Sequence, residues 1–237
     1  MRCIGRVILE LNRMIMRCLK LPLMKDEDET IRKLLVPLLK EKFFVKTFVR
    51  VDKIHQRLKT EGFLSPEEQA IKHPFHPDID VLYWPKEYTQ EPEIFAAEVK
   101  YFRLKDGNIY PTIYEGLGEA MMLLTFGFNH VSLWHLFDPE VDSETVSRYR
   151  DLTQNLINDT NSPVNYQSWS LPQLPKITMV SQEQPTTLGS IVRFRNLLNQ
   201  NTFISSVTFG LKDNPLVNRW DTRIMRAIIK KNYRMVK

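Results

Sequence analysis

The sequence predicts an α/β protein with one central sheet and a helical extension at the C-terminus. Segments rich in β-branched and aromatic residues, typical of strands, alternate with segments whose apolar residues recur at helical spacing. The chain has 237 residues, enough to bury a sizeable core in one elaborated domain. Hydrophobic residues make up 43% and charged residues 26% of the chain, as in ordinary globular proteins.

The first part of the chain predicts a helix, a strand and a second helical segment. Residues 26–42 begin with a cluster of acids and continue with apolar residues at helical spacing, which favours a helix. Pro37 lies inside this pattern and predicts a kink or a break. Residues 43–51 are β-branched and aromatic and predict a strand. Residues 52–72 are expected to be helical or irregular, with a helix beginning near Ser65.

Three more strands and two more helices follow. The strands are expected at residues 78–84, 94–103 and 129–137, and the helices at residues 112–126 and 143–157. The last of these strands is almost continuously apolar, which indicates burial on both faces. The predicted element order is therefore α, β, β, β, α, β, α.

The remaining chain suggests how the protein is divided. Residues 161–185 are rich in Pro, Ser and Gln and favour a domain edge, and two helices are expected beyond it. Those helices are residues 187–198 and 221–233. The expected divisions are a basic amphipathic extension at 1–25, an α/β core at 26–183 and a basic helical extension at 184–237. The first 23 residues form either an amphipathic basic helix or a loosely attached segment before a natural start at Met24.

Charge is distributed unevenly along the chain. Residues 219–237 hold seven basic residues and one acid, whereas residues 78–98 hold six acids and one base. A metal site that acts on a polyanion needs acids to hold the cation and separate bases to hold the phosphates. A solvated helix face and ordinary loop acids are the other interpretation. The candidate phosphate-binding residues are Arg219, Arg223, Arg226, Lys230 and Lys231.

Cysteine and histidine usage excludes several classes of protein. The two cysteines, Cys3 and Cys18, form neither a disulfide framework nor a four-cysteine zinc site, and favour a reducing, cytoplasmic setting. No segment approaches the roughly 18 uninterrupted apolar residues of a membrane span, so no membrane association is expected. His73 and His76 with Asp78 resemble half of a zinc site but lack closing ligands, so we favour a proline-rich loop.

Three polar residues on two predicted strands are the strongest candidates for chemistry. Because alternate strand residues face the same side, Glu98 and Lys100 point together while Val99 points into the core. Asp80 converges on them if the two strands are neighbours. Two carboxylates can hold Mg²⁺ or Mn²⁺, which lowers the pKa of a bound water and neutralises charge on a phosphate. The alternative is that Glu98 and Lys100 form the exposed face of a half-buried strand.

These segments resemble the PD-(D/E)xK nuclease superfamily, whose restriction-endonuclease-like fold also occurs in archaeal Holliday-junction resolvases. PDID at 77–80 and EVK at 98–100 look like its two central motifs, with 17 residues between Asp80 and Glu98. The αβββαβ order is similar as well, and the resemblance covers residues 28–137. It implies a mixed central sheet, Mg²⁺-dependent (or Mn²⁺-dependent) hydrolysis of DNA, and a homodimer that cuts two strands.

The resemblance also implies roles for individual residues. Asp80 and Glu98 would hold the metal together with the Val99 carbonyl, and Lys100 would assist the attacking water. Asp78 is the alternative to Asp80, because it directly follows the proline.

Two further acids would complete such a site. The acid on the first helix would be Glu29, with Glu41 second, and the acid on the helix after the EVK strand would be Glu119, with Glu115 second. A different class of function stays open, namely a nuclease-fold protein that has lost catalysis and only binds DNA or assembles with another protein.

Overall fold

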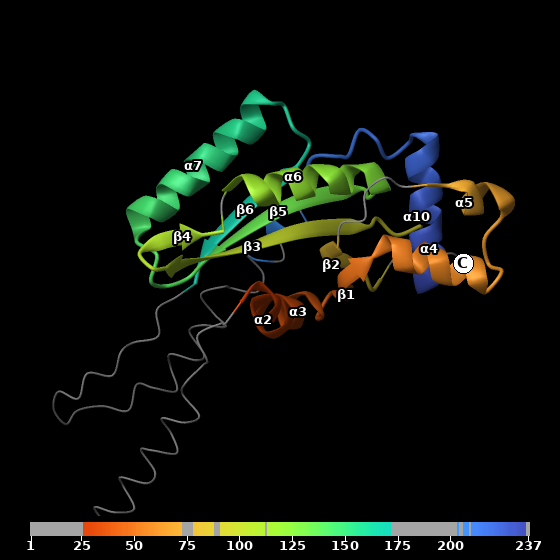
Figure 1. Cartoon of the computed structure of the whole chain (residues 1–237), viewed down its shortest axis with the longest axis horizontal. Helices are drawn as coiled ribbons and strands as arrows, with labels where there is room; N and C mark the ends of the chain where they lie inside the picture. The colour runs from red at the N-terminus through yellow and green to blue at the C-terminus, as the bar shows by residue number, and fades with distance from the viewer. Residues whose placement is uncertain are drawn as a thin grey trace, which may run out of the picture.

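The chain forms a mixed sheet with helices on both faces, as the computed structural model shows (Figure 1). The structure describes residues 26–72, 78–87, 91–111, 113–171, 203, 206–208 and 210–235. The predicted α/β class and the predicted C-terminal helix are confirmed. The expected extension at 1–25, the helix at 187–198, and His73 and His76 lie outside the described residues.

Among the residues that the structure describes, the sheet has six strands, in the order β1-β2-β3-β5-β6, with β4 paired to the end of β3. β1 to β3 are antiparallel neighbours, whereas β3, β5 and β6 run parallel. The strands are β1 (Phe43–Arg50), β2 (Asp78–Pro85), β3 (Phe95–Lys105), β4 (Asn108–Tyr110), β5 (His130–Phe137) and β6 (Asn165–Ser170). The first three strands and β5 confirm the sequence prediction, and the parallel pairing of β3 with β5 makes the sheet mixed.

One strand lies where the sequence predicted a domain edge. β6 (Asn165–Ser170) pairs with β5 along its whole length and is the edge strand on that side among the described residues. Its sequence, NYQSWS, is mostly polar and half-buried, because an edge strand has only one neighbour and need not be apolar on both faces. The sheet therefore includes residues 165–170, which lie inside the α/β core expected at 26–183 although their composition also favoured a domain edge.

The first helix continues through Pro37 without a break. α2 (Glu27–Thr30) continues through the π-helical η1 (Ile31–Leu35) into α3 (Val36–Leu39). In η1 the Val36 N–H donates to the Ile31 carbonyl, one residue further back than in an α-helix. Pro37 has no N–H to offer the carbonyl four residues before it, and a π turn just ahead of it lets the chain adjust locally.

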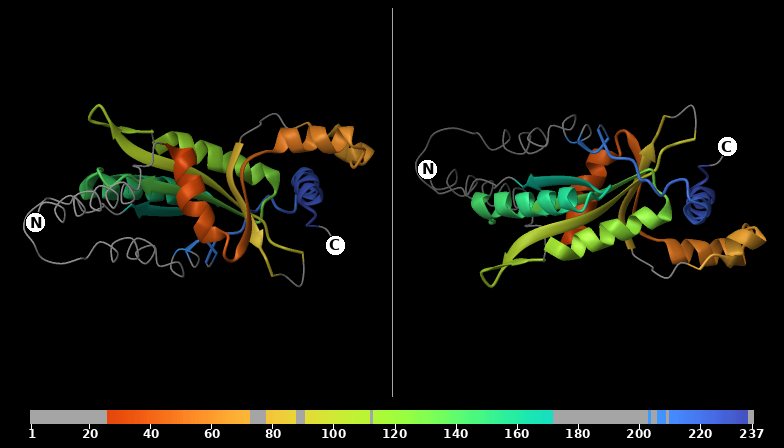
Figure 2. Two further views of the ribbon diagram at one scale, coloured as in Figure 1. Left: turned by 90° about the horizontal axis from the view of Figure 1, so that it is seen from below. Right: turned by 90° about the horizontal axis from the view of Figure 1, so that it is seen from above.

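The other helices cover the second face and one end of the sheet. α6 (Ile113–Leu123), its 3-10 continuation η2 (Leu124–Phe126) and α7 (Ser143–Asp159) lie on the face opposite to α2 and α3 (Figure 1). At one end, α4 (Val51–Thr60), α5 (Pro66–Ala70) and α10 (Trp220–Tyr233) lie side by side (Figures 1 and 2). The predicted helix start at Ser65 is confirmed, because the Ser65 side chain and Glu68 form a capping box.

Two apolar clusters sit on opposite faces of the sheet. Val99 belongs to the cluster under η1 and α3 with Ala97 and Tyr101, as the alternation of side chains along β3 predicts. The other cluster lies under α6 and includes α10 residues such as Ile228 and Ile229. Among the described residues, no helix is both long and apolar enough to cross a membrane.

Candidate functional site: acids and a lysine where two strands diverge

The site begins where β2 and β3 separate. These strands pair only between Val81–Tyr83 and Phe95–Ala97, so β3 is no longer paired with β2 beyond Ala97, and β4 pairs with it only from Arg103 onward. Along this edge of β3, the carboxylates of two acids accept hydrogen bonds from the backbone N–H groups of the strand. The Val99 N–H donates to Asp80 Oδ2 at 2.8 Å, and the Tyr101 N–H donates to Glu27 Oε2 at 3.2 Å. Divergence of the strands therefore brings carboxylates to backbone groups that a continuous ladder would have used.

Lys100 lies at the centre of a group of carboxylates. Its Nζ is 2.7 Å from Glu98 Oε1, 2.7 Å from Glu119 Oε2 and 3.8 Å from Glu27 Oε1. Asp80 and Glu98 are only 8% and 3% exposed, so both are buried rather than part of a solvated strand face. We refer to Glu27, Asp80, Glu98, Lys100 and Glu119 as the acid–lysine cluster.

A glycine on α6 makes this arrangement possible. A Cβ atom on Gly116 would lie 2.7 Å from Lys100 Cγ and 3.0 Å from Leu133 Cδ1. The missing side chain lets α6 approach β3 closely, and the Lys100 stem lies beneath it. Glu119, three residues further along the same helix, lies on the same side of the helix as Gly116 and reaches the Lys100 ammonium.

Burial and crowding of charge shift the protonation of the two buried carboxyls. Burial raises the pKa of Asp80, and the Glu27 charge adds to the effect, against the Val99 hydrogen bond. Burial also raises the pKa of Glu98, followed by the Asp80 charge and a hydrogen bond with Glu119. Without an added cation, two carboxylates in one buried site repel, and one of them retains a proton.

The pKa values of Lys100 and Glu27 are also raised, whereas that of Glu119 is lowered. Burial alone would lower the pKa of Lys100, but the charges of Glu98 and Glu27 outweigh it and raise that pKa, so the ammonium stays charged. Burial raises the pKa of Glu27. Partial burial also acts to raise the pKa of Glu119, but hydrogen bonds with Glu98 and Lys100 outweigh it and lower that pKa.

A histidine on the neighbouring strand borders the cluster. His135 on β5 is opposite Lys100 in the sheet and fully buried. Burial, and then the Lys100 charge, lower its pKa to about 3, so the ring is neutral at physiological pH. Nδ1 lies 3.0 Å from the Tyr166 hydroxyl, and Nε2 has no hydrogen-bond partner among the described residues.

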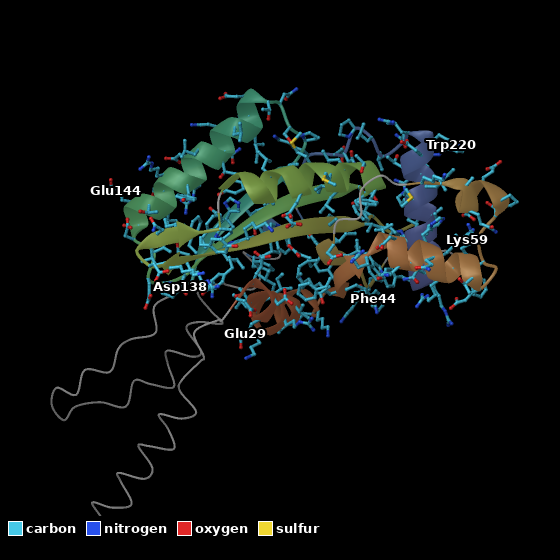
Figure 3. The ribbon with its side chains drawn as sticks, in the orientation of Figure 1. Glu29, Phe44, Lys59, Asp138, Glu144 and Trp220 are labelled. Atoms are coloured by element: carbon cyan, nitrogen blue, oxygen red, sulfur yellow. The ribbon has the colours of Figure 1, made fainter. Side chains whose placement is uncertain are left out.

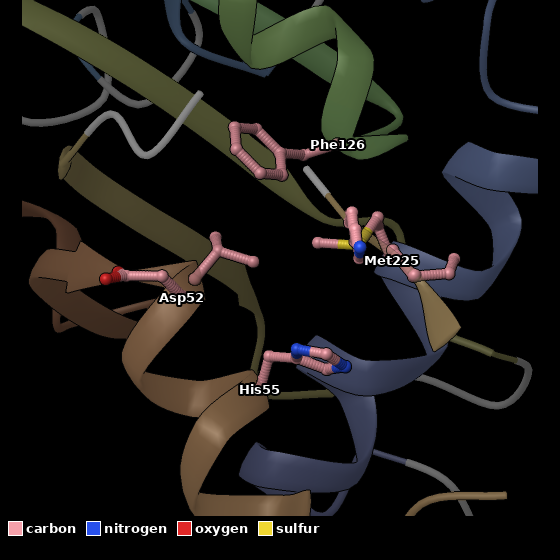
Figure 4. Close-up of a pocket in the computed structure, with 7 residues that line it drawn as sticks. Asp52, His55, Phe126 and Met225 are labelled. Carbon is pink, nitrogen blue, oxygen red and sulfur yellow. The ribbon is translucent and has the colours of Figure 1, made fainter. Parts of the chain in front are cut away.

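A cavity of about 220 Å³ opens beside the cluster. Its lining residues are Asp26, Glu27, Lys100, Tyr101, Arg103, Tyr110 and Pro111. A larger cavity of about 410 Å³ lies at the α4–α10 end of the molecule, bordered by Asp52, His55, Phe126 and Met225 among others (Figure 4). Its lining includes none of the cluster residues, so the smaller cavity is the one that gives access to Lys100.

The structure brings together four of the residues predicted from the sequence. Asp80, Glu98, Lys100 and Glu119 meet as expected, and the Val99 backbone faces Asp80. Asp78, the alternative to Asp80, is 55% exposed in its side chain and pairs with Arg50 instead.

The acid on the first helix is not the one predicted. Glu29 forms an ion pair with Lys33, and Glu41 is exposed, whereas Glu27 reaches both Lys100 and the Tyr101 N–H. The prediction of Glu29 is therefore corrected to Glu27. The side chain of Glu115, the alternative to Glu119, lies outside the described part of the structure.

The basic C-terminal residues lie away from the cluster. α10 packs against α4, α5 and η2, and Trp220 at its start is at the opposite end of the molecule from Asp138, which follows β5 (Figure 3). Lys230 is buried and paired with Glu91, and Lys231 binds Glu68 at 2.6 Å. Arg219 pairs with Asp221, whereas Arg223 is exposed and Arg226 is partly buried. Lys230 and Lys231 therefore hold α10 onto the core through these ion pairs, and their role as phosphate ligands stays a prediction.

The donor atoms of the cluster suit a hard divalent cation. Within the described ranges, no group of three or more His, Cys, Asp or Glu side chains has the arrangement of a metal site. Asp80 and Glu98 offer two carboxylates, and the Val99 carbonyl points to the same edge as its N–H. Mg²⁺ commonly uses one or two protein carboxylates and keeps several waters. Burial first, and then the charge of a neighbouring carboxylate, raises the pKa of Asp80 and of Glu98, and a bound cation would favour their charged forms.

Comparison with known proteins gives no relatives for this chain. No family model matches it, and neither does any curated protein or solved structure.

Proposed function

We propose that this protein is a metal-dependent endonuclease of the PD-(D/E)xK type that hydrolyses DNA phosphodiester bonds. The observation that carries the proposal is the meeting of Asp80, Glu98 and Lys100 at the point where β2 and β3 diverge. Support for a restriction-endonuclease-like core comes from the antiparallel β1–β2–β3 unit followed by α6 and by β5 parallel to β3.

The residues of the cluster have distinct parts in the proposed reaction. Asp80, Glu98 and the Val99 carbonyl would hold Mg²⁺ or Mn²⁺, which when bound supplies an activated water and neutralises charge on the phosphate. The Lys100 ammonium orients the attacking water and stabilises the negative charge that builds up on the phosphoryl oxygens. Glu27 and Glu119 touch Lys100 from two sides and fix its direction.

Plasmid nicking tests the proposal. Wild-type protein should nick supercoiled DNA with Mg²⁺, and EDTA or Lys100→Ala should abolish nicking. Asp78→Asn is the matched control, because Asp78 is on the same strand as Asp80 but outside the cluster, and it should keep wild-type activity. Equal nicking in EDTA, or by Lys100→Ala, would rule out the assignment.

A second candidate is a nuclease-fold protein that binds DNA or assembles with a partner without cutting. It is favoured by the ion pairs that Lys100 makes with Glu98 and Glu119, because they engage the Lys100 ammonium within the cluster. Salt-sensitive DNA binding with no nicking under any divalent metal would support this candidate over hydrolysis.

A homodimer would allow both strands of a duplex to be cut by one site each. Light scattering during size-exclusion chromatography, with and without DNA, would show whether two copies assemble.

A further inference from the structure

An exposed aromatic ring borders the cavity that leads to Lys100. Tyr110 is 54% exposed and lines the same cavity as Lys100 and Glu27. It lies on β4, which pairs with the end of β3 so that Tyr110 is opposite Arg103. The β3–β4 hairpin projects beyond the rest of the sheet (Figure 2), so the ring is held by backbone pairing next to the cluster.

Two cationic side chains lie near this ring, in a cavity that Asp26 and Glu27 also line. Arg103 lines the cavity with Tyr110 and Lys100, and Lys105 Nζ lies 6.0 Å from the centre of the Tyr110 ring. An aromatic face flanked by cations is the chemistry that binds nucleotides, because the ring stacks on a base while the cations attract its phosphates.

The size of the cavity restricts what can enter. Its 220 Å³ is below the roughly 300–1,000 Å³ of sites for drug-sized ligands, so it has room for a single base but not for a larger part of a duplex. A tyrosine ring can stack only on a base whose own stacking in the duplex is broken. The cavity therefore favours a strand that is unpaired next to the reacting phosphate.

We propose that the cavity binds the nucleotide adjoining the cleaved phosphodiester, with its base stacked on Tyr110, and that the preferred substrate is DNA with an unpaired strand at the cut. This inference rests on the proposed function, since it places the scissile phosphate at Lys100. Arg103 and Lys105 would attract the flanking phosphates from the hairpin side.

DNA binding measured in EDTA tests the inference separately from cleavage. A fluorescently labelled splayed duplex and a fully paired duplex of the same length are titrated with each protein, and anisotropy reports affinity. Tyr110→Ala should weaken binding of the splayed DNA about fivefold or more, the effect of losing one base–aromatic stack, and leave the paired duplex unchanged. Tyr110→Phe should bind both DNAs as the wild type does.

Leu104→Ala is the matched control, because Leu104 is an exposed apolar residue of the same hairpin that does not line the cavity. It should leave both affinities unchanged. The inference is overturned if wild-type protein binds neither DNA, if Tyr110→Ala weakens both DNAs equally or neither, or if Tyr110→Phe behaves like Tyr110→Ala. Failure of nicking together with Tyr110-dependent binding would refute hydrolysis but keep the nucleotide site.

Discussion

The Cβ atom that Gly116 lacks would lie 2.7 Å from Lys100 Cγ. The position of the Lys100 side chain, and with it the contact to Glu119, depends on a helix residue with no side chain. Gly118, two residues on, is exposed and has no atom within 4 Å of the corresponding position. The same helix thus provides a glycine that the cluster requires and one that it does not.

Gly116→Ala should overpack the α6–β3 contact and disturb the cluster. We expect a loss of about 1–3 kcal/mol in the free energy of unfolding, with loss of nicking. Gly118→Ala should instead stabilise the helix by about 0.5–1 kcal/mol and keep activity. Urea unfolding and nicking assays measure both effects, and equal stability changes in the two variants would contradict the packing argument.

Stability should fall as pH rises above the ordinary range of a carboxyl pKa. Asp80 and Glu98 have raised pKa values in the folded state, so between the unfolded and folded pKa values the folded state binds more protons. Each such carboxyl lowers stability by up to about 1.4 kcal/mol per pH unit across that window. Melting temperatures between pH 5 and 8 should fall less steeply for Glu98→Gln than for wild type.

Mg²⁺ should oppose this loss. The cation binds the deprotonated carboxylates, so it should raise the melting temperature of wild type more at pH 8 than at pH 5. A shift of the same size at both pH values would contradict the link between metal binding and these two carboxyls.

Glu27 should matter more than Glu29 for activity. Glu27 contacts Lys100 and accepts from the Tyr101 N–H, whereas Glu29 pairs with Lys33. Loss of a positioning group commonly costs about 10–100-fold in activity, so we expect Glu27→Gln to slow nicking by that amount. Glu29→Gln should stay near the wild-type rate, and the reverse order would restore the sequence-based assignment.

Substitutions at two residues of α10 should affect different properties, with Lys230 affecting stability and Arg223 affecting DNA binding. The Lys230 side chain is 4% exposed and pairs with Glu91, so Lys230→Ala should cost about 1–3 kcal/mol of stability. Exposed Arg223 should change stability by less than about 0.5 kcal/mol when replaced by Ala. If α10 contacts DNA, Arg223→Ala should also reduce the salt dependence of binding by about one counterion. Unchanged DNA binding by Arg223→Ala would remove α10 from the interface.

Side-chain periodicity predicted the centre of the site but not its surroundings. Alternation along β3 placed Glu98 and Lys100 on one side and Val99 on the other, and short-range patterns suffice for that. The choice between Glu27 and Glu29 depends on how the helix is rotated over the sheet, which a run of four consecutive acids cannot reveal. The Asp26 side chain fixes the helix start by accepting from the Glu29 N–H at 2.8 Å.

The parts that the sequence did not predict depend on long-range contacts. β6 is a polar edge strand and carries no apolar run to mark it. Lys230 looked like one of a row of exposed bases, because its partner Glu91 is 139 residues away in sequence. Only the packing of α10 against the core decides which of its cations face solvent.

A calorimetric titration of Mn²⁺ tests most directly whether the cluster holds a metal. We expect one binding event per chain for wild type and for Asp78→Asn, and none for Asp80→Asn or Glu98→Gln. No binding by wild type, or unchanged binding by Asp80→Asn, would contradict it.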